Sequence, residues 1–237
     1  MNNNAWTPRE SKSWPRPPIL FEDNHVLVVS KPARLPTMGV PAGEESLLTI
    51  LKDFIKVRDN KPGNVYLGVM SRLDAPVTGL VLVAKTSKAA SRLTDQFKKR
   101  TVEKYYRAIV EGSDMPDEED CVNWLRKDQR HRRVHLCDAE HPDAQEARLS
   151  YRVLKRMRTH TLLEVKLETG RKHQIRIQLG KRGYPILGDR KYGAVRRFPE
   201  GISLHAFRLK FSHPTLGEPV EIVAPLPKIW EKFGVSK

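Results

Sequence analysis

The sequence predicts an α+β fold around one mostly antiparallel sheet. Apolar and polar residues alternate in several segments, which is typical of strands, and other segments have helical spacing, without the regular order of βαβ units. With 237 residues, the chain can bury a sizeable core. Residues 1–18, rich in Asn, Pro and charge, are expected to form an extended arm that Trp6 and Trp14 hold against a main domain over residues 19–237.

The first part of this domain is expected to mix strands with two short helices. Residues 21–30 read as a hairpin turn and a buried strand. A helix follows, with Ser46 as its N-cap. The β-rich run over residues 79–85 leads into a second helix, capped at Thr86 or Ser87, and residues 102–110 return as a strand.

The second part is expected to contain further strands, an exposed loop and one segment that could be a strand or a helix. Residues 111–121 hold six acidic residues and no basic one, so they are predicted to form an exposed loop. Strands are expected around residues 163–167, 205–211 and 220–223. In residues 175–179 the apolar positions fit a strand and a helix equally well.

Charge favours a polyanionic partner. The 43 Lys and Arg residues outnumber the 28 acidic residues, which gives a formal net charge of +15 and makes nucleic acid the leading candidate. Two cysteines do not make a disulfide scaffold, and the N-terminus has no apolar signal segment. No run approaches the roughly 18 apolar residues of a membrane span. We therefore expect a soluble cytoplasmic protein without a membrane partner.

The segment from Gly68 to Lys85 is the first candidate for chemistry. It sets the carboxylate of Asp74 beside the guanidinium of Arg72, in a turn that runs into an apolar strand. An enzyme can present a fixed acid at the edge of a sheet in this way. A turn-forming Asp that bonds its own backbone is the plainer alternative, and Asp74 alone does not decide between them.

The second candidate lies from Gly170 to Arg176, where cations and amides gather at the end of a strand. Glycine lets a ligand approach the backbone closely, and a helix N-terminus with nearby Arg suits a phosphate or a carboxylate. An ordinary solvated helix start is the alternative.

Other chemistries have weaker support. A zinc site is rejected because the candidate ligands have no paired CxxC and lie among arginines: His131, His135, Cys137 and His141. Glycine-rich phosphate loops of the GxxxxGK[ST] and GxGxxG types are missing from the sequence. Nucleotide-driven chemistry therefore has no support in the sequence.

The order and the residues of these motifs resemble those of the RluA-type family of pseudouridine synthases over residues 19–227. The matching blocks include Ser71-Arg-Leu-Asp74 with Thr78-Gly79, Lys104-Tyr-Tyr106-Arg-Ala108, Thr169-Gly-Arg-Lys-His-Gln-Ile-Arg176 and Gly183-Tyr-Pro-Ile-Leu-Gly188-Asp189. The resemblance implies a catalytic domain over residues 19–237, with a cleft across its sheet, that isomerises specific uridines of rRNA or tRNA without a cofactor. Structured RNA is the implied partner, and no obligatory protein partner is evident.

The resemblance also assigns roles. Asp74 is the essential carboxylate that acts at the anomeric carbon, by direct attack or by assisting departure of the base. Arg176 pairs with it, and Tyr106 lies against the base and helps to remove a proton from ring carbon 5. Arg72 fills the space that the flipped uridine leaves. RNA contacts are expected from Arg72, Arg171, Lys172, His173 and Gln174.

Three positions depart from the family pattern, which usually has His at Ser71, Gly near Arg34 and often His near Met38. Two alternative functions stay open: an RNA chaperone on the same scaffold and a glycosylase that releases free uracil. The sequence names neither the target uridine, nor the number of sites, nor the oligomeric state.

Overall fold

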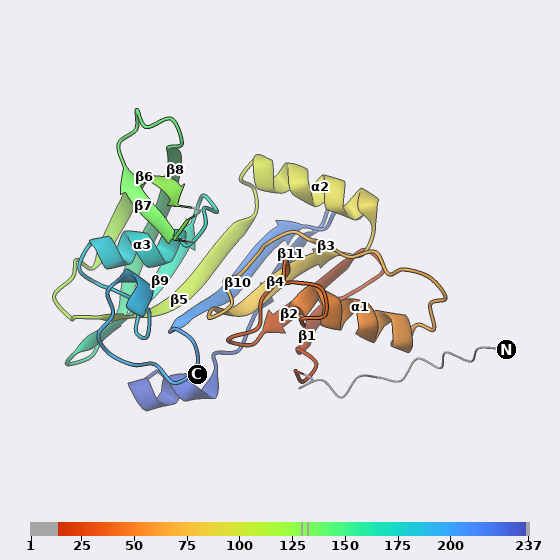
Figure 1. The fold of residues 1–237 in the computed structure, drawn as a ribbon, viewed down its shortest axis with the longest axis horizontal. Helices are drawn as coiled ribbons and strands as arrows, with labels where there is room; N and C mark the ends of the chain where they lie inside the picture. Colours follow the sequence, from red (N-terminus) through yellow and green to blue (C-terminus); the bar gives the residue numbers. More distant parts are fainter. Residues whose placement is uncertain (1–13, 129, 132, 236–237) are drawn as a thin grey trace.

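The computed structural model describes residues 14–128, 130–131 and 133–235 and has the expected α+β class. Across these residues eleven strands form one sheet, with three α-helices and two 3-10 helices around it (Figure 1). Residues 14–18 carry no helix or strand, and Trp14 packs half-buried against the core. Trp6 lies outside the described residues.

The strands and helices have the following bounds. The strands are β1 Ile19–Glu22, β2 Val26–Lys31, β3 Gly68–Val69, β4 Thr78–Ala84, β5 Glu103–Glu111, β6 Glu118–Asp128, β7 Arg133–Cys137, β8 Gln145–Arg156, β9 His160–Leu167, β10 Leu204–Ser212 and β11 Pro219–Val223. The helices are α1 Leu47–Arg58, α2 Ser87–Lys98, α3 Gln174–Lys181, η1 Arg190–Tyr192 and η2 Lys228–Phe233.

The sheet runs in the order β1-β2-β4-β10-β5-β9-β8-β6-β7, with β3 beside β4 and β11 beside β10. Among the described pairs, β4 and β10 are parallel and the others are antiparallel. Gly79 makes this parallel contact possible, because a Cβ there would lie 2.3 Å from the Ala206 carbonyl oxygen. Its φ of +107° also suits glycine alone. The turn before β4, which holds Asp74, is thereby fixed against the middle of the sheet.

The main core lies in the half of the sheet that contains β2 and β4. All seven residues of β4 are buried, as are five of the six in β2, so both faces of this half are covered. Helices α1 and α2 lie beside this half and α3 lies over the other (Figure 1). In that second half, β8 alternates buried and exposed residues, so one face stays open to solvent.

The predicted helix starts are confirmed. Ser46 caps α1 in a capping box, since its hydroxyl accepts from the Thr49 amide and the Thr49 hydroxyl accepts from the Ser46 amide. Thr86 caps α2 by accepting from the Ala89 amide. Residues 175–179 belong to α3, which settles the ambiguity in favour of a helix: both Ile175 and Leu179 are buried in the core.

The prediction of an exposed loop over residues 111–121 is wrong at both ends. Residue 111 ends β5, and β6 begins at Glu118 and pairs with β8 from Glu118 to Leu125. The acidic residues suit a half-solvated strand, because Glu118 and Asp120 point outward while Cys121 is fully buried. Met115, inside the intervening loop, is 2% exposed. The density of acidic residues in this stretch correctly predicts its exposure to solvent. It does not predict that part of the stretch forms a strand.

Every helix within the described ranges is too short or too polar to cross a lipid bilayer.

Candidate active site

A cavity of about 410 Å³ opens between the turn before β4, the loop after β2 and the start of α3. Five of the candidate residues line it: Arg72, Asp74, Lys172, His173 and Arg176. The loop after β2 contributes Pro36, Thr37 and Met38, and η1 contributes Lys191. Segments more than 100 residues apart in sequence therefore meet at one cavity.

The turn that carries Asp74 is held by hydrogen bonds on both sides. The Leu73 amide donates to the Thr37 hydroxyl at 3.1 Å, and that hydroxyl donates to the Leu73 carbonyl at 2.7 Å. The Val77 amide donates to the Asp74 carbonyl at 3.0 Å. The backbone of Asp74 is thus positioned without its carboxylate, which leaves the side chain available.

Lys31, at the end of β2, supports this turn from inside the protein. Its side chain is 1% exposed, and Nζ donates to the carbonyls of Pro32, Leu35 and Ala75 at 2.8, 2.7 and 3.1 Å. Burial lowers the pKa of Lys31 to about 7, while the nearby Asp74 opposes that shift. A Lys at the end of a strand is usually solvated, so the sequence alone does not indicate this role.

Arg176 joins two carboxylates from different loops. Nη1 donates to Oδ2 of Asp74 at 2.8 Å, while Nε and Nη2 donate to the two carboxylate oxygens of Asp189 at 2.7 and 2.9 Å. Side-chain exposure is 7% for Arg176, 1% for Asp189 and 26% for Asp74. Asp189 therefore clamps the guanidinium in the interior, and the clamp aims its remaining edge at Asp74.

Asp189 is a site residue that sequence reasoning missed. It belongs to the Gly188-Asp189 block of the resemblance, but nothing in the local sequence indicates that it is buried. Its backbone begins η1, where its carbonyl accepts from the amides of Tyr192 and Ala194. The same residue thus builds the η1 turn and holds Arg176.

Gln174 organises the start of α3 from the interior of the protein. Gln174 is 2% exposed, and its side-chain oxygen accepts from the Thr169 hydroxyl at 2.7 Å and from the Arg171 amide at 3.0 Å. Its amide nitrogen donates to the Arg148 carbonyl at 3.0 Å. The Arg171 guanidinium donates to the Glu146 carbonyl and does not line the cavity. Gln174 and Arg171 therefore shape the corner that presents Arg176.

His173 precedes α3 in the left-handed conformation, with φ of 54°, and lines the cavity. Its Nε2 lies 3.7 Å from Oδ1 of Asp74. Burial lowers the pKa of His173 to about 4, although the Asp74 charge opposes this shift. The imidazole is accordingly neutral at neutral pH.

Tyr106 lies in β5, near enough for the charge of Asp74 to act on its phenol, but it is not among the residues that line the cavity. Successive strand residues face opposite sides of a sheet, so Tyr105 and Tyr106 point to different faces. Burial raises the pKa of Tyr106 above its usual range, and the charge of Asp74 raises it further. Tyr106 is therefore a phenol at neutral pH, suited to stacking and to donating a hydrogen bond.

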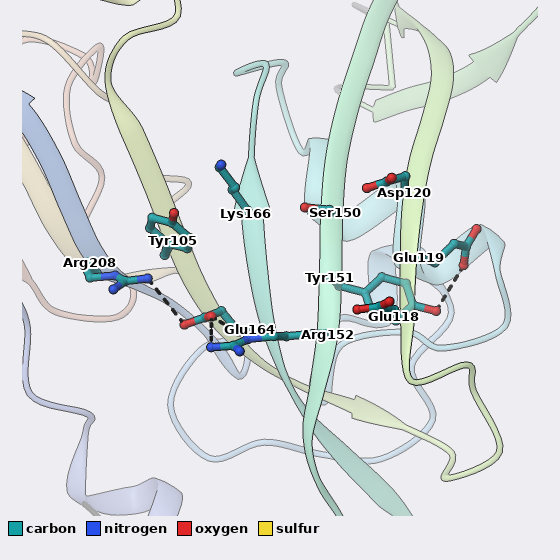
Figure 2. A pocket seen from close by; sticks show the side chains of 10 residues that line it. All are labelled: Tyr105, Glu118, Glu119, Asp120, Ser150, Tyr151, Arg152, Glu164, Lys166 and Arg208. Carbon is teal, nitrogen blue, oxygen red and sulfur yellow. Dashed lines mark hydrogen bonds and ion pairs between the residues drawn. The ribbon is translucent and has the colours of Figure 1, made fainter.

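A larger hollow of about 670 Å³ lies on the other face of the sheet, over β5, β9, β8 and β6 (Figure 2). Two of its acids are already paired: Glu164 contacts Arg107 and Arg152 at 2.7 Å, and Glu119 contacts Arg182 at 2.8 Å. The other two, Glu118 and Asp120, are exposed, whereas Asp74 is a partly buried carboxylate that an arginine orients beside the smaller cavity.

Two histidines of the rejected zinc site contact an aspartate instead. His131 and His135 both face Asp128, at 2.8 and 3.4 Å from its Oδ2. Within the described part of the chain, no three His, Cys, Asp or Glu side chains are grouped as metal ligands.

The fold and this site define a class of protein. The solved structure titled Human RNA Pseudouridylate Synthase Domain Containing 4 aligns with a TM-score of 0.77 at 24% identity, over 92% of this chain and 94% of that one. Human RNA Pseudouridylate Synthase Domain Containing 1 aligns with a TM-score of 0.69 at 25% identity, over 90% and 84%. The fold is that of pseudouridine synthases.

The family follows from the sequence itself. Residues 25–181 match the RNA pseudouridylate synthase family, and the chain belongs to it. Ribosomal large subunit pseudouridine synthase D of Xanthomonas campestris pv. campestris is 36% identical over 230 residues, which cover 89% of this chain and 66% of that protein. Its namesake in Yersinia pestis is 33% identical over 245 residues, 94% and 70% of the two chains. The chain thus spans about two thirds of the length of these relatives.

Proposed function

We propose that this protein isomerises uridine to pseudouridine in RNA, in the cytoplasm, and that residues 19–237 carry the reaction. Family membership supports the reaction class. The observation that carries the proposal is the state of Asp74: Arg176 holds Oδ2 at 2.8 Å, while Oδ1 is left free of that guanidinium beside the cavity. One oxygen fixes the orientation of the carboxylate, and the other is available for reaction.

Asp74 acts at the anomeric carbon of the target uridine. The bond from this carbon to ring nitrogen 1 breaks, either by attack of Oδ1 or by departure of the base with assistance from the carboxylate. The freed uracil turns and ring carbon 5 bonds to the anomeric carbon. In the route by attack, this step breaks the bond from Oδ1 to the anomeric carbon and restores the carboxylate. The proton on carbon 5 then leaves, and nitrogen 1 gains a proton. Because product and substrate are isomers, the balance needs no cofactor. Tyr106, as a phenol, packs against the base and donates a hydrogen bond.

The target must leave its base stack to reach Asp74. Flipping a nucleotide costs a few kcal/mol, and less in a loop than in a duplex. Arg72, two residues before Asp74, also lines the cavity. In this proposal its side chain occupies the space that the base vacates. Exposed Lys172, at the mouth of the same cavity, supplies attraction to phosphate.

The proposed substrate is structured RNA, with RNA of the large ribosomal subunit as the first choice. This choice rests on the names of the relatives, which act on the ribosomal large subunit. Transfer RNA is the second choice. The net charge of +15 supports either, since both are polyanions.

The test is release of tritium from RNA labelled at uracil ring carbon 5. Unmodified ribosomal RNA and transfer RNA are incubated separately with the wild type and with Asp74→Asn, and each digest is analysed for pseudouridine and free uracil. We expect release by the wild type, pseudouridine in equal amount, and no release by Asp74→Asn.

Two results would contradict the proposal. Free uracil without pseudouridine would make the protein a glycosylase. Tight RNA binding by the wild type with no tritium release from either pool would favour a binding role.

A further inference from the structure

A short chain of polar contacts, two of them hydrogen bonds, leads to Asp74 from outside the cavity. The Val134 amide, in β7, donates to the Tyr192 hydroxyl at 3.3 Å. That hydroxyl lies 2.6 Å from Nδ1 of His173, and the two rings meet edge to face at 5.6 Å between centroids. The opposite ring nitrogen, Nε2, lies 3.7 Å from Oδ1 of Asp74.

The tautomer of His173 sets the direction of its hydrogen bond with Tyr192. The Asp74 carboxylate favours a proton on Nε2, because an unprotonated Nε2 would turn its lone pair toward that negative charge. A backbone amide can only donate, so Tyr192 accepts from Val134 and has its own proton left for His173. Burial lowers the pKa of His173 and raises that of Tyr192, so both groups are neutral at neutral pH. A neutral imidazole that accepts at Nδ1 carries its proton on Nε2. Nε2–H therefore faces Asp74.

The neighbours of this chain of contacts hold it in place. A Cβ on Gly180 of α3 would lie 2.6 Å from the Tyr192 carbonyl oxygen, so glycine allows η1 to approach α3 closely. Tyr192 also packs against the small apolar cluster that contains Val134 and Ile177. The Arg176 guanidinium lies over its ring, 5.2 Å from the centroid.

The arrangement distributes two kinds of donor over the two oxygens of Asp74. Oδ2 receives the charged guanidinium of Arg176, whereas Oδ1 faces a neutral N–H. A second cation at Oδ1 would withdraw charge from the oxygen that reacts. A neutral donor can orient Oδ1 and leave its charge in place. The separation of 3.7 Å is longer than a hydrogen bond, and such contacts commonly shorten when substrate binds.

We propose that His173 is a positioning residue that presents a neutral Nε2–H to Oδ1 of Asp74, and that Tyr192 sets this tautomer by donating to Nδ1. This inference rests on the proposed function, because it assigns Oδ1 as the reacting oxygen. It gives a role to a tyrosine that does not itself line the cavity.

The first test reads the tautomer directly and needs no turnover. Two-bond proton–nitrogen correlation NMR of the nitrogen-15 labelled protein at pH 7 distinguishes protonated from unprotonated ring nitrogens. We expect His173 with protonated Nε2 and unprotonated Nδ1 in the wild type, and a mixture of tautomers in Tyr192→Phe. A proton on Nδ1 in the wild type would overturn the proposal.

The second test is a double-mutant cycle with Tyr192→Phe and His173→Gln. Gln offers an N–H near the position of Nε2 and has no acceptor atom at the position of Nδ1. We expect Tyr192→Phe to lower kcat about fivefold, the value of one neutral hydrogen bond, with RNA Kd within about twofold. In the His173→Gln background the same change should alter kcat by less than about twofold.

Equal losses from Tyr192→Phe in both backgrounds would overturn the role of Tyr192, since a purely structural tyrosine would produce them. Unchanged kcat in both single variants would overturn the positioning of Asp74. Failure of the proposed function is recognised separately: the wild type would then release no tritium, while the NMR measurement would still report the tautomer.

Discussion

Two clusters of arginine and carboxylate lie on opposite faces of the same sheet, and they differ in stoichiometry. At the cavity, Arg176 stands between Asp74 and Asp189 at 2.8 and 2.7 Å. On the other face, Glu164 stands among Arg107, Arg152 and Arg208 at 2.7, 2.7 and 3.9 Å. Figure 2 shows its contacts with Arg152 and Arg208. The closest distances are nearly equal, so distance alone does not mark the active site.

The difference lies in which charge is in excess. One guanidinium cannot saturate two carboxylates, so an oxygen of Asp74 remains for another partner. Three guanidinium groups around Glu164 leave that carboxylate fully engaged. A cluster with surplus acid beside a cavity can do chemistry, whereas a cluster with surplus base on a solvated sheet face stabilises the strands.

Matched arginine substitutions should separate the clusters most strongly. Arg176→Met removes a charge-assisted hydrogen bond from Asp74, so we expect kcat to fall about a hundredfold. Arg152→Met, in the other cluster, should change kcat by less than about twofold, because its side chain is 62% exposed. Single-turnover rates at saturating RNA, taken below the melting temperature of each variant, provide the measurement. Equal losses from both would remove the distinction.

Asp189 should contribute more to the free energy of unfolding than an exposed aspartate that pairs with an arginine. Asp189→Asn removes one charge of a buried pair, so we expect a loss of about 3 kcal/mol in the free energy of unfolding. The control is Asp117→Asn, whose side chain is 89% exposed and pairs with Arg156; we expect a change within about 0.5 kcal/mol. Urea unfolding followed by circular dichroism measures both. A small effect at Asp189 would contradict its role as a clamp.

Salt dependence should tell which face meets RNA. Lys172 is exposed at the cavity mouth and Lys166 is exposed on the opposite face. Lys172→Ala should reduce the slope of log K against log salt concentration by about 1, and Lys166→Ala should leave it unchanged. Filter binding from 50 to 300 mM salt gives the slopes. A reduced slope for Lys166→Ala alone would place RNA on the face drawn in Figure 2.

The smallest expected effect is that His173 does not titrate between pH 8 and pH 5. Burial lowers the pKa of His173 to about 4, so its ring proton signals should not shift between pH 8 and pH 5. In the unfolded chain the same group takes up a proton near 6.5. The unfolded state then binds more protons, so this histidine should make the folded state less stable as pH falls from about 6.5 to about 4. A titration midpoint near 6.5 in the folded protein would contradict the burial of His173.

The sequence predicts the strands and helices that have clear periodicity and leaves the arrangement of charges open. Asp74 and Arg176 are found from the sequence because each lies in a distinctive block, next to a turn. The burial of Lys31, Asp189 and Gln174 cannot be predicted from the sequence, because polar residues near turns are usually solvated. Only the packing of the folded chain excludes water from these three side chains. The acidic stretch before Cys121 shows the converse: charge predicts exposure, while pairing with β8 decides that it forms a strand.

The central claim is that the carboxylate of Asp74 performs the reaction, and a pair of isosteric changes tests it most directly. Conversion of one saturating RNA substrate is measured under single-turnover conditions for Asp74→Asn and for Asp120→Asn, an exposed acid of the other hollow, together with the RNA Kd of each. We expect Asp74→Asn to lose at least roughly a thousandfold in rate with Kd near that of the wild type, and Asp120→Asn to match the wild type in both. Substantial conversion by Asp74→Asn would contradict the account.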